Sequence, residues 1–273
     1  MVRRLFICSA ADSASVNIRD ALIASAEWDD TDGILYHDDT AMITIPEMHI
    51  YADNVDDIAV KKGVDAEEMI FLSRHRSSSG IPTLTVHPIG NFHDADLGGR
   101  PRTLVKAAPR TMTGILKGLA SSDTKGFGVS FEVTHHGPWV NVPSAFVEIG
   151  SDETQWNNRA AANIIADALL NKEDNDHISA IGIGGGHYAP RFTEVALKYK
   201  VNIGHMIPEY AFANSDDEDV ARMVREAAEK SCTKTAYVHK RSMKGAVAKR
   251  ITDVVISCGL ETISSADLDV IRE

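Results

Sequence analysis

The chain has 273 residues, of which 44% are hydrophobic and 25% are charged, and its formal net charge is −11. This composition is typical of a globular protein and excludes a fibrous or low-complexity chain, while the acidic balance argues against indiscriminate binding of nucleic acid, and we expect no DNA partner. No apolar run is long enough to cross a bilayer, and three widely spaced cysteines do not make a disulfide framework, so we expect a cytoplasmic protein without a membrane partner.

Strands and helices alternate through the first half of the chain, as judged from apolar periodicity and turn residues. The expected elements are a strand at 4–10, a helix from Ser13 or Ser15 to about Glu27, a hairpin formed by 33–38 and 41–51, a short helix near 65–69, strands at 69–75 and 83–90, and a helix at 103–119. We expect His37 and His49, both in the hairpin region, to lie on the surface.

The second half continues the alternation. The expected elements are strands at 128–137 and 144–150, a helix at 154–170, a strand at 178–183, a helix at 190–199, a strand at 201–207, a helix at 216–231, a strand at 235–240 and a helix at 243–258. The whole chain, 1–273, is therefore predicted to form a single doubly wound α/β domain, with a mixed sheet, flanking helices and an inserted hairpin.

A glycine-rich turn follows the buried strand at 178–183. In "GIGGGHYAP", Gly184, Gly185 and Gly186 precede His187, and Pro190 suits the first turn of the next helix. Consecutive glycines are typical of positive φ or of a close approach to the backbone. The turn therefore predicts either a cradle for an anion or substrate, or only a tight connection between strand and helix.

Histidines and carboxylates gather where strands end, which is where α/β sheets place ligand sites. In "GVSFEVTHHGP", period-two alternation would put Glu132 and His136 on one face of a strand and turn His135 across. A carboxylate that orients an imidazole suits a general base or a metal ligand, although a satisfied polar pair is the simpler alternative. Glu148 lies within an apolar strand and needs a partner, either an ordinary ion pair or a functional cation.

Two basic segments interrupt the acidic chain. One contains Arg100 and Lys106, the other contains Lys244 and Lys249, and neither segment includes an acidic residue. They predict a polyanion-binding face, or otherwise two solvated helix faces. At the end of another strand, Arg74, His75 and Arg76 are candidate phosphate contacts, or incidental charges on an exposed loop.

Six motifs together resemble the archaeal and plant D-aminoacyl-tRNA deacylases, the second type of that activity. They are "FLSRHRSSSGIPTLTVHPIGNF", "EVTHHGPW", "FVEIGS", "WNN", "GIGGGHYAPRFTE" and "IGHMIPEYA". The resemblance implies hydrolysis of the ester between a D-amino acid and the terminal ribose of tRNA, such as D-tyrosyl-tRNA. It also implies zinc dependence and a fold similar to peptidyl-tRNA hydrolases and nucleoside phosphorylases.

Within that resemblance we assign roles as hypotheses. His136, oriented by Glu132, is expected to be the general base, and His135, His187 and Glu148 are the candidate zinc ligands because imidazole and carboxylate groups suit zinc. The basic residues and the glycine turn would bind tRNA, and we expect a monomer. A metal-dependent amidase or peptidase, and a non-catalytic RNA-binding protein, remain alternative interpretations of the same residues.

Overall fold

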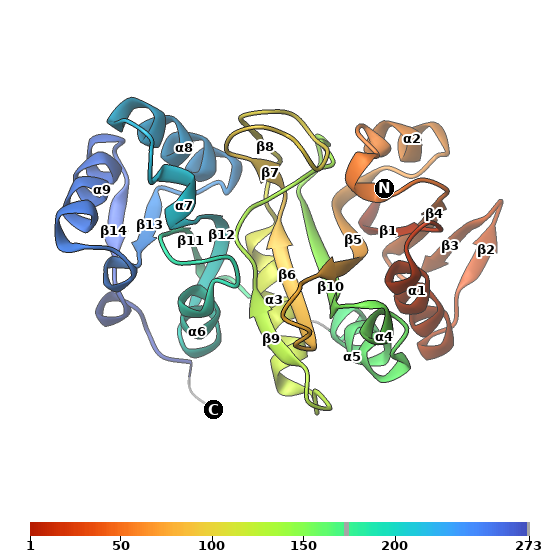
Figure 1. The fold of residues 1–273 in the computed structure, drawn as a ribbon. Coiled ribbons are helices and arrows are strands. Elements are labelled where there is room, and N and C mark those ends of the chain that lie inside the picture. The colour runs from red at the N-terminus through yellow and green to blue at the C-terminus, as the bar shows by residue number, and fades with distance from the viewer. Residues whose placement is uncertain (172–174, 272–273) are drawn as a thin grey trace.

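The computed structural model describes residues 1–171 and 175–271, and it has a mixed α/β architecture (Figure 1). Hydrogen bonding divides the strands between an eight-stranded sheet, a four-stranded sheet and a two-stranded ribbon. The expected mixed sheet with flanking helices is confirmed, although two main sheets share the strands that we expected in one. Among the described residues, none of the helices is both long and apolar enough to cross a membrane.

The large sheet is mixed, and its strands follow the order β2-β3-β4-β1-β5-β10-β6-β9. Its members are β1 (Val2–Ser9), β2 (Asp29–Thr31), β3 (Ile34–His37), β4 (Thr40–Ile45), β5 (Ala66–Arg76), β6 (Thr83–Pro88), β9 (Gly128–Phe131) and β10 (Ser144–Ser151). β1, β4, β5 and β10 pair in parallel, whereas β6 runs antiparallel to β10. The central strands are buried on both faces, which explains their nearly continuous apolar sequences.

The small sheet is entirely parallel, with the order β12-β11-β13-β14. Its strands are β11 (Ile178–Ile183), β12 (Val201–Ile207), β13 (Thr235–Val238) and β14 (Glu261–Ile263). The chain goes from β11 to its neighbour on one side and then crosses to the other side to form β13. The order of connection therefore reverses between β11 and β13. A separate ribbon pairs β7 (Gly90–Asn91) with β8 (Thr103–Leu104).

Helices cover both sheets (Figure 1). They are α1 (Ser13–Ser25), α2 (Val55–Lys61), α3 (Pro109–Ser121), α4 (Glu153–Trp156), α5 (Arg159–Leu170), α6 (Pro190–Lys198), α7 (Glu209–Phe212), α8 (Asp217–Lys230) and α9 (Gly245–Ser257), with single 3-10 turns at His49–Tyr51, Lys240–Ser242 and Ser265–Asp267. α3 packs against β6 of the large sheet and β12 of the small one, so it joins the two.

The segment after β9 also joins the sheets. The backbone N–H of Glu132 donates to Val86 on β6, at 3.0 Å, which continues the pairing of the large sheet. The next two N–H groups donate to the other half of the molecule, from Val133 to His187 O at 2.9 Å and from Thr134 to Met206 O at 3.1 Å. Glu132 therefore lies at the seam between the two sheets.

Several sequence predictions need correction. The short helix near 65–69 is wrong, because these residues begin β5, which pairs with β1 and β10 on its two sides and so overrides the helix propensity of Ala66 and the glutamates after it. The cap of α1 is Asp12, whose carboxylate accepts from the N–H groups of Ala14 and Ser15. His49 is fully buried, with Nε2 at 2.9 Å from Leu72 O.

The limits of two helices also differ from those expected. The helix expected at 154–170 divides at Asn158, whose side chain caps α5, and the helix expected at 103–119 starts only at Pro109 because residues 103–104 form β8. α2 and β14 were not predicted at all. The hairpin of β3 and β4, the strand β11 and the helix that begins at Pro190 are confirmed.

Candidate active site

Neighbouring strands of the large sheet bring four polar side chains together. His75 lies on β5, Glu148 on β10 and His87 on β6, which are adjacent in that order, while Glu132 directly follows β9. Gly150 makes room for them, because a Cβ at this position would lie 2.3 Å from Thr83 Oγ1 and 3.0 Å from the ring of His75. A full side chain there would displace the histidine.

Glu132 is the centre of the cluster. Its carboxylate is fully buried and lies within ion-pair distance of three rings, at 2.9 Å from His187 Nε2, 3.1 Å from His75 Nδ1 and 3.5 Å from His135 Nε2. Burial alone would raise the pKa of this carboxyl, but His187 and His75 outweigh burial and hold it well below its usual range. Glu132 is therefore a permanent negative charge at the base of the site.

His75 connects two carboxylates to a tyrosine. Its Nδ1 lies 3.1 Å from Glu132 and 3.6 Å from Glu148, and its Nε2 lies 3.0 Å from the hydroxyl of Tyr188. Burial disfavours the charged ring, but the two carboxylates overcome it and raise the pKa of His75 to about 11. The ring is thus an imidazolium at neutral pH, and Nε2–H donates to Tyr188 Oη, leaving the tyrosine's own proton free to be donated elsewhere.

Three further histidines form a second group beside Glu132. One ligand atom from each of His87, His135 and His136 lies within 4.8 Å of the others. In every ring Nδ1 faces a backbone carbonyl, at 3.1 Å from Pro88 O, 2.8 Å from Val133 O and 2.6 Å from Gly137 O respectively. Because a carbonyl oxygen only accepts, Nδ1 carries the proton, and a neutral ring then has its free lone pair on Nε2.

Burial and mutual repulsion affect the protonation of this group. Burial, with the charge of His87, lowers the pKa of His136 to about 4 and that of His135 well below its usual value. Burial also disfavours charge on His87, but the neighbouring Glu148, at 3.7 Å, raises the pKa of that ring. His87 Nε2 is buried and has no hydrogen-bond partner among the described residues.

The glycine turn positions His187. Gly184 and Gly185 have φ of +103° and +82°, and their N–H groups donate to Ile207 O at 2.8 Å and Ser242 Oγ at 2.9 Å. These two amides are already used, which favours a tight turn over an anion cradle. What the turn presents is the His187 ring, whose side chain is 36% exposed while Glu132 beneath it is not exposed at all.

The structure brings the predicted site residues together, but they contact different partners from those expected. β9 ends at Phe131 and His136 has a φ of +46°, so the strand alternation that paired Glu132 with His136 does not occur. Among the described contacts Glu132 pairs with His187 instead. His135, His187 and Glu148 do not appear together in any of the described groups that could hold a metal ion.

No role was expected for Tyr188 from the sequence, whereas His87 was expected either to pack at the end of its strand or to be a ligand. His87 stands at the end of β6 just before Pro88, and Tyr188 directly follows His187. Both residues belong to motifs that carry the family resemblance. Their position next to the ends of strands could therefore have indicated a place in the site.

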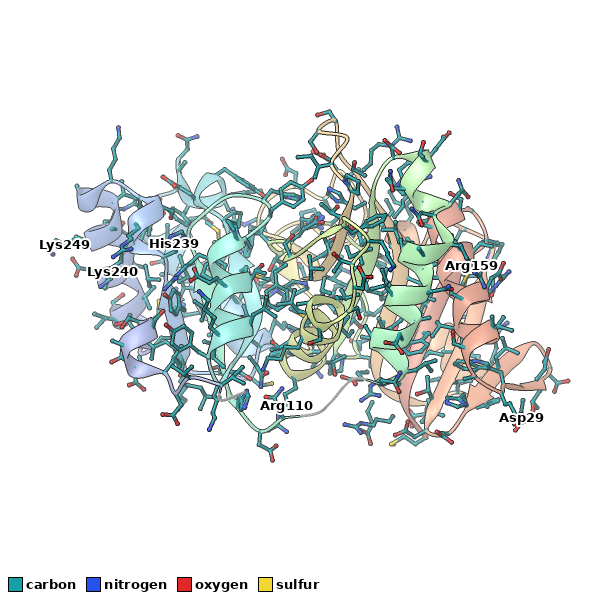
Figure 2. The ribbon with its side chains drawn as sticks, turned by 90° about the horizontal axis from the view of Figure 1, so that it is seen from below. Asp29, Arg110, Arg159, His239, Lys240 and Lys249 are labelled. Carbon is teal, nitrogen blue, oxygen red and sulfur yellow. The ribbon has the colours of Figure 1, made fainter. Side chains whose placement is uncertain are left out.

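The predicted basic residues spread over distant parts of the surface. Arg100 stacks on Trp139 at 3.4 Å, and Arg74 and Arg76 lie 4.9 Å and 5.0 Å from the ring of Trp156. Lys249 pairs with Asp253 at 2.6 Å, whereas Lys106 and Lys244 are exposed. Figure 2 shows Lys240 and Lys249 at the small-sheet end and Arg110 below the middle of the molecule.

The fold and the cluster define a class of protein. An exposed imidazole held by a buried carboxylate, beside three histidines that each direct Nδ1 to a backbone carbonyl, is an arrangement that hydrolases use.

Comparison with known proteins identifies the family. A model of D-aminoacyl-tRNA deacylase matches residues 62–263. Proteins named D-aminoacyl-tRNA deacylase are 37% identical in Methanosarcina acetivorans, over 96% of this chain and 92% of that one, and 36% identical in Archaeoglobus fulgidus, over 96% of both. A crystal structure of a conserved protein of unknown function is 34% identical, covers 99% of both chains and superimposes with a TM-score of 0.88. The chain belongs to the D-aminoacyl-tRNA deacylase family.

Proposed function

We propose that this chain hydrolyses the ester bond of D-aminoacyl-tRNA at the Glu132 cluster. Water forms a bond to the ester carbonyl carbon, the bond from that carbon to the ribose oxygen breaks, and the water's proton passes to the ribose oxygen. The products are a free D-amino acid and tRNA with its terminal hydroxyl restored. The observation that carries the proposal is the contact of 2.9 Å between buried Glu132 and half-exposed His187, in a chain of this family.

His187 is the general base in this scheme. Its Nε2 faces the permanent charge of Glu132, which keeps the proton on that nitrogen and leaves Nδ1 as the acceptor for the proton of water. Glu132 orients the ring and stabilises the imidazolium that forms, as a buried carboxylate does for a catalytic histidine. The same ring then returns the proton to the leaving ribose oxygen.

Tyr188 is suited to bind the ester carbonyl. Its hydroxyl accepts from the imidazolium of His75 at 3.0 Å and therefore donates its own proton outward, next to His187. A donor fixed in advance, with a positive charge behind it, stabilises the oxygen that becomes negative during attack. Glu148 has a supporting role, because it helps keep His75 charged.

The residues also fit a zinc ion, which the family resemblance implies. His87, His135 and His136 would hold it, because each directs Nδ1–H to a carbonyl and His87 Nε2 is an orphaned buried atom. To hold the ion, His87 would have to be neutral, although the neighbouring Glu148 favours its charged form. When bound by three histidines, zinc retains a position for water and lowers the pKa of that water to about 7.

The test is deacylation of D-tyrosyl-tRNA and L-tyrosyl-tRNA, with and without a chelator. We expect turnover of the D-ester, and loss of that turnover when zinc is removed, with recovery on addition of zinc. Stoichiometric zinc without ester hydrolysis would favour an amidase or peptidase instead. Tight tRNA binding without any turnover would favour a non-catalytic RNA-binding protein.

A further inference from the structure

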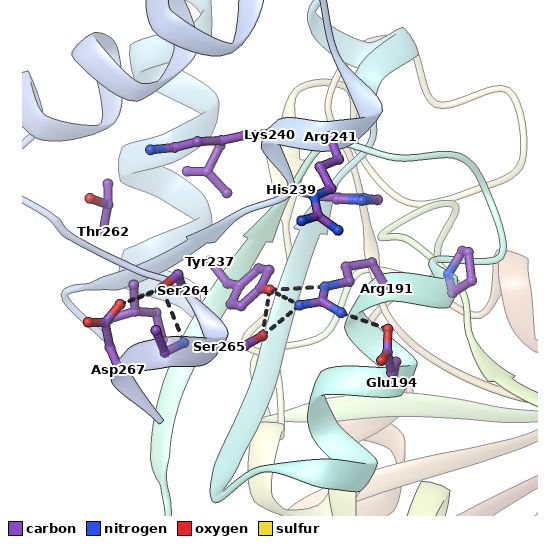
Figure 3. A pocket seen from close by; sticks show the side chains of 14 residues that line it. Arg191, Glu194, Tyr237, His239, Lys240, Arg241, Thr262, Ser264, Ser265 and Asp267 are labelled. Carbon is purple, nitrogen blue, oxygen red and sulfur yellow. Dashed lines mark hydrogen bonds and ion pairs between the residues drawn. The ribbon is translucent and has the colours of Figure 1, made fainter. Parts of the chain in front are cut away.

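A cavity lies outside the carboxyl ends of the parallel strands of the small sheet (Figure 3). Its lining includes the start of α6, which follows β11 and contributes Arg191, and the segments that follow the other two strands, His239 to Arg241 after β13 and Ser264 to Asp267 after β14. The order of connection reverses between β11 and β13, and the crevice outside such a reversal is where open α/β sheets bind ligands. The volume of about 780 Å³ is within the usual range for a small ligand.

The charges in this cavity favour an anion. Both carboxylates of the lining are already used, Glu194 by Arg191 and Lys198, and Asp267 by the N–H and hydroxyl of Ser264. Lys240 and Arg241 are exposed and have no ion-pair partner among the described residues. Burial, together with the charges of Arg191 and Arg241, lowers the pKa of His239, so that the ring is neutral beside two guanidinium groups.

Arg191 forms a rigid wall of the cavity. Its guanidinium donates to the hydroxyl of Tyr237 at 2.6 Å, to Ser265 Oγ at 2.6 Å and to Glu194 at 2.7 Å, as Figure 3 shows. These bonds use most of its N–H groups. Arg241 is thus the guanidinium left to bind a ligand, and the planar fork of arginine matches the oxygens of a phosphate.

The cavity is connected to the candidate active site through one hydroxyl. Ser242 Oγ accepts from the N–H of Gly185, at 2.9 Å, and donates to His239 O, also at 2.9 Å. The loop that lines the cavity is therefore hydrogen-bonded to the turn that presents His187. A polymer whose end reaches His187 could place an earlier residue in this cavity.

We propose that this cavity binds the phosphate of a nucleotide near the aminoacylated end of tRNA, with Arg241 as its principal contact. The inference rests on the proposed function, because the ester then lies at His187 while the cavity holds the strand that leads to it. Lys240 adds charge, and the hydroxyl group of Thr262 is a further donor of the lining. The same phosphate chemistry occurs in a free mononucleotide, which the experiment treats separately.

The experiment compares Arg241→Ala, Arg241→Lys and a matched control, Lys62→Ala, which removes one exposed charge from the end of α2. We would measure kcat and KM with D-tyrosyl-tRNA and with the D-tyrosyl ester of adenosine, which has no phosphate. Binding of uncharged tRNA and of adenosine monophosphate would be measured in parallel. Because binding needs no turnover, the cavity is tested even if the chain fails to hydrolyse either ester.

Arg241→Ala should raise KM and Kd for tRNA about ten-fold, while KM for the adenosine ester changes less than two-fold. Arg241→Lys should restore part of the affinity, and Lys62→Ala should change neither. Equal tRNA affinity in Arg241→Ala and the unmodified chain would overturn the proposal. Weaker binding of adenosine monophosphate alone, with unchanged tRNA affinity, would assign the cavity to a free nucleotide and overturn it too.

Discussion

At the scale of single residues, the decisive question is which histidine transfers protons and which ones could hold metal. His187 contacts Glu132 and is the accessible ring, whereas His136 has its Nδ1 on a carbonyl, 2.6 Å away, beside His87 and His135. His187→Ala should therefore keep zinc and lower kcat by about 10²–10⁴, the usual contribution of a general base. His136→Ala should lose zinc and activity together.

Zinc content by mass spectrometry and single-turnover deacylation distinguish these roles. His37→Ala, in the hairpin far from the cluster, is the control and should alter neither quantity. The reverse result, zinc lost from His187→Ala and kept in His136→Ala, would restore the ligand set expected from the sequence.

His205 makes a prediction about stability. It is fully buried, with Nε2–H on Val105 O at 2.8 Å and Nδ1 at 3.0 Å from Thr134 Oγ1, and burial lowers its pKa to about 4. A depressed folded pKa stabilises the protein above pH 6.5, and this stability is lost as the pH falls towards 4. The shift corresponds to on the order of 3 kcal/mol.

Denaturant unfolding at several pH values tests this linkage. The free energy of unfolding of His205→Gln should fall less steeply between pH 6.5 and 4 than that of the unmodified chain. Parallel curves for the two proteins would refute the role given to His205, and His37→Gln is the matched control.

At the scale of elements, the glycine turn after β11 contains one glycine that a side chain should disturb and one that it should not. A Cβ on Gly184, where φ is +103°, would lie 2.8 Å from Ser242 Oγ, whereas nothing lies within 4 Å of a Cβ on Gly186. Gly184→Ala should therefore cost about 1–3 kcal/mol of stability and move His187, while Gly186→Ala should be tolerated. Thermal unfolding and kcat of the two variants give the answer, and equal behaviour would contradict it.

Element prediction succeeded where local pattern and tertiary structure agree. The apolar run before Gly184 and the proline that opens α6 were recognised because strand, turn and helix start each have a local signal. The strand expected to run through His136 was wrong, because alternation cannot reveal that β9 ends at Phe131 and that Val133 and Thr134 bond with the other sheet. The partner of Glu132 depended on that contact.

At the scale of the whole molecule, binding of tRNA should depend on salt through separated basic residues. Charge reversal of Arg100 with Lys106, or of Lys244 with Lys249, should raise KM more than it lowers kcat. Each lost phosphate contact should flatten the salt dependence by about one unit of slope. Since Lys249 already pairs with Asp253, Lys244→Glu alone should give most of the effect of its double variant.

Kinetics at several salt concentrations check this prediction. An unchanged KM and slope in both double variants would exclude these residues from the tRNA interface. The sequence identified the two basic segments, but only the fold shows that Arg102 and Arg250 find carboxylates outside their own segments, in Asp219 and Asp217. Likewise, the single domain and the likeness to peptidyl-tRNA hydrolases and nucleoside phosphorylases stay predictions.

The short stretch from Glu132 to Thr134 couples the large sheet to the small sheet. Its bonds to His187 O and Met206 O mean that Glu132 and His187, the proposed base, belong to different sheets and meet only when those sheets are docked. Activity should therefore depend on correct docking of the two sheets. A buried substitution in α3, which packs between the sheets, should lower activity without altering any residue that contacts the substrate.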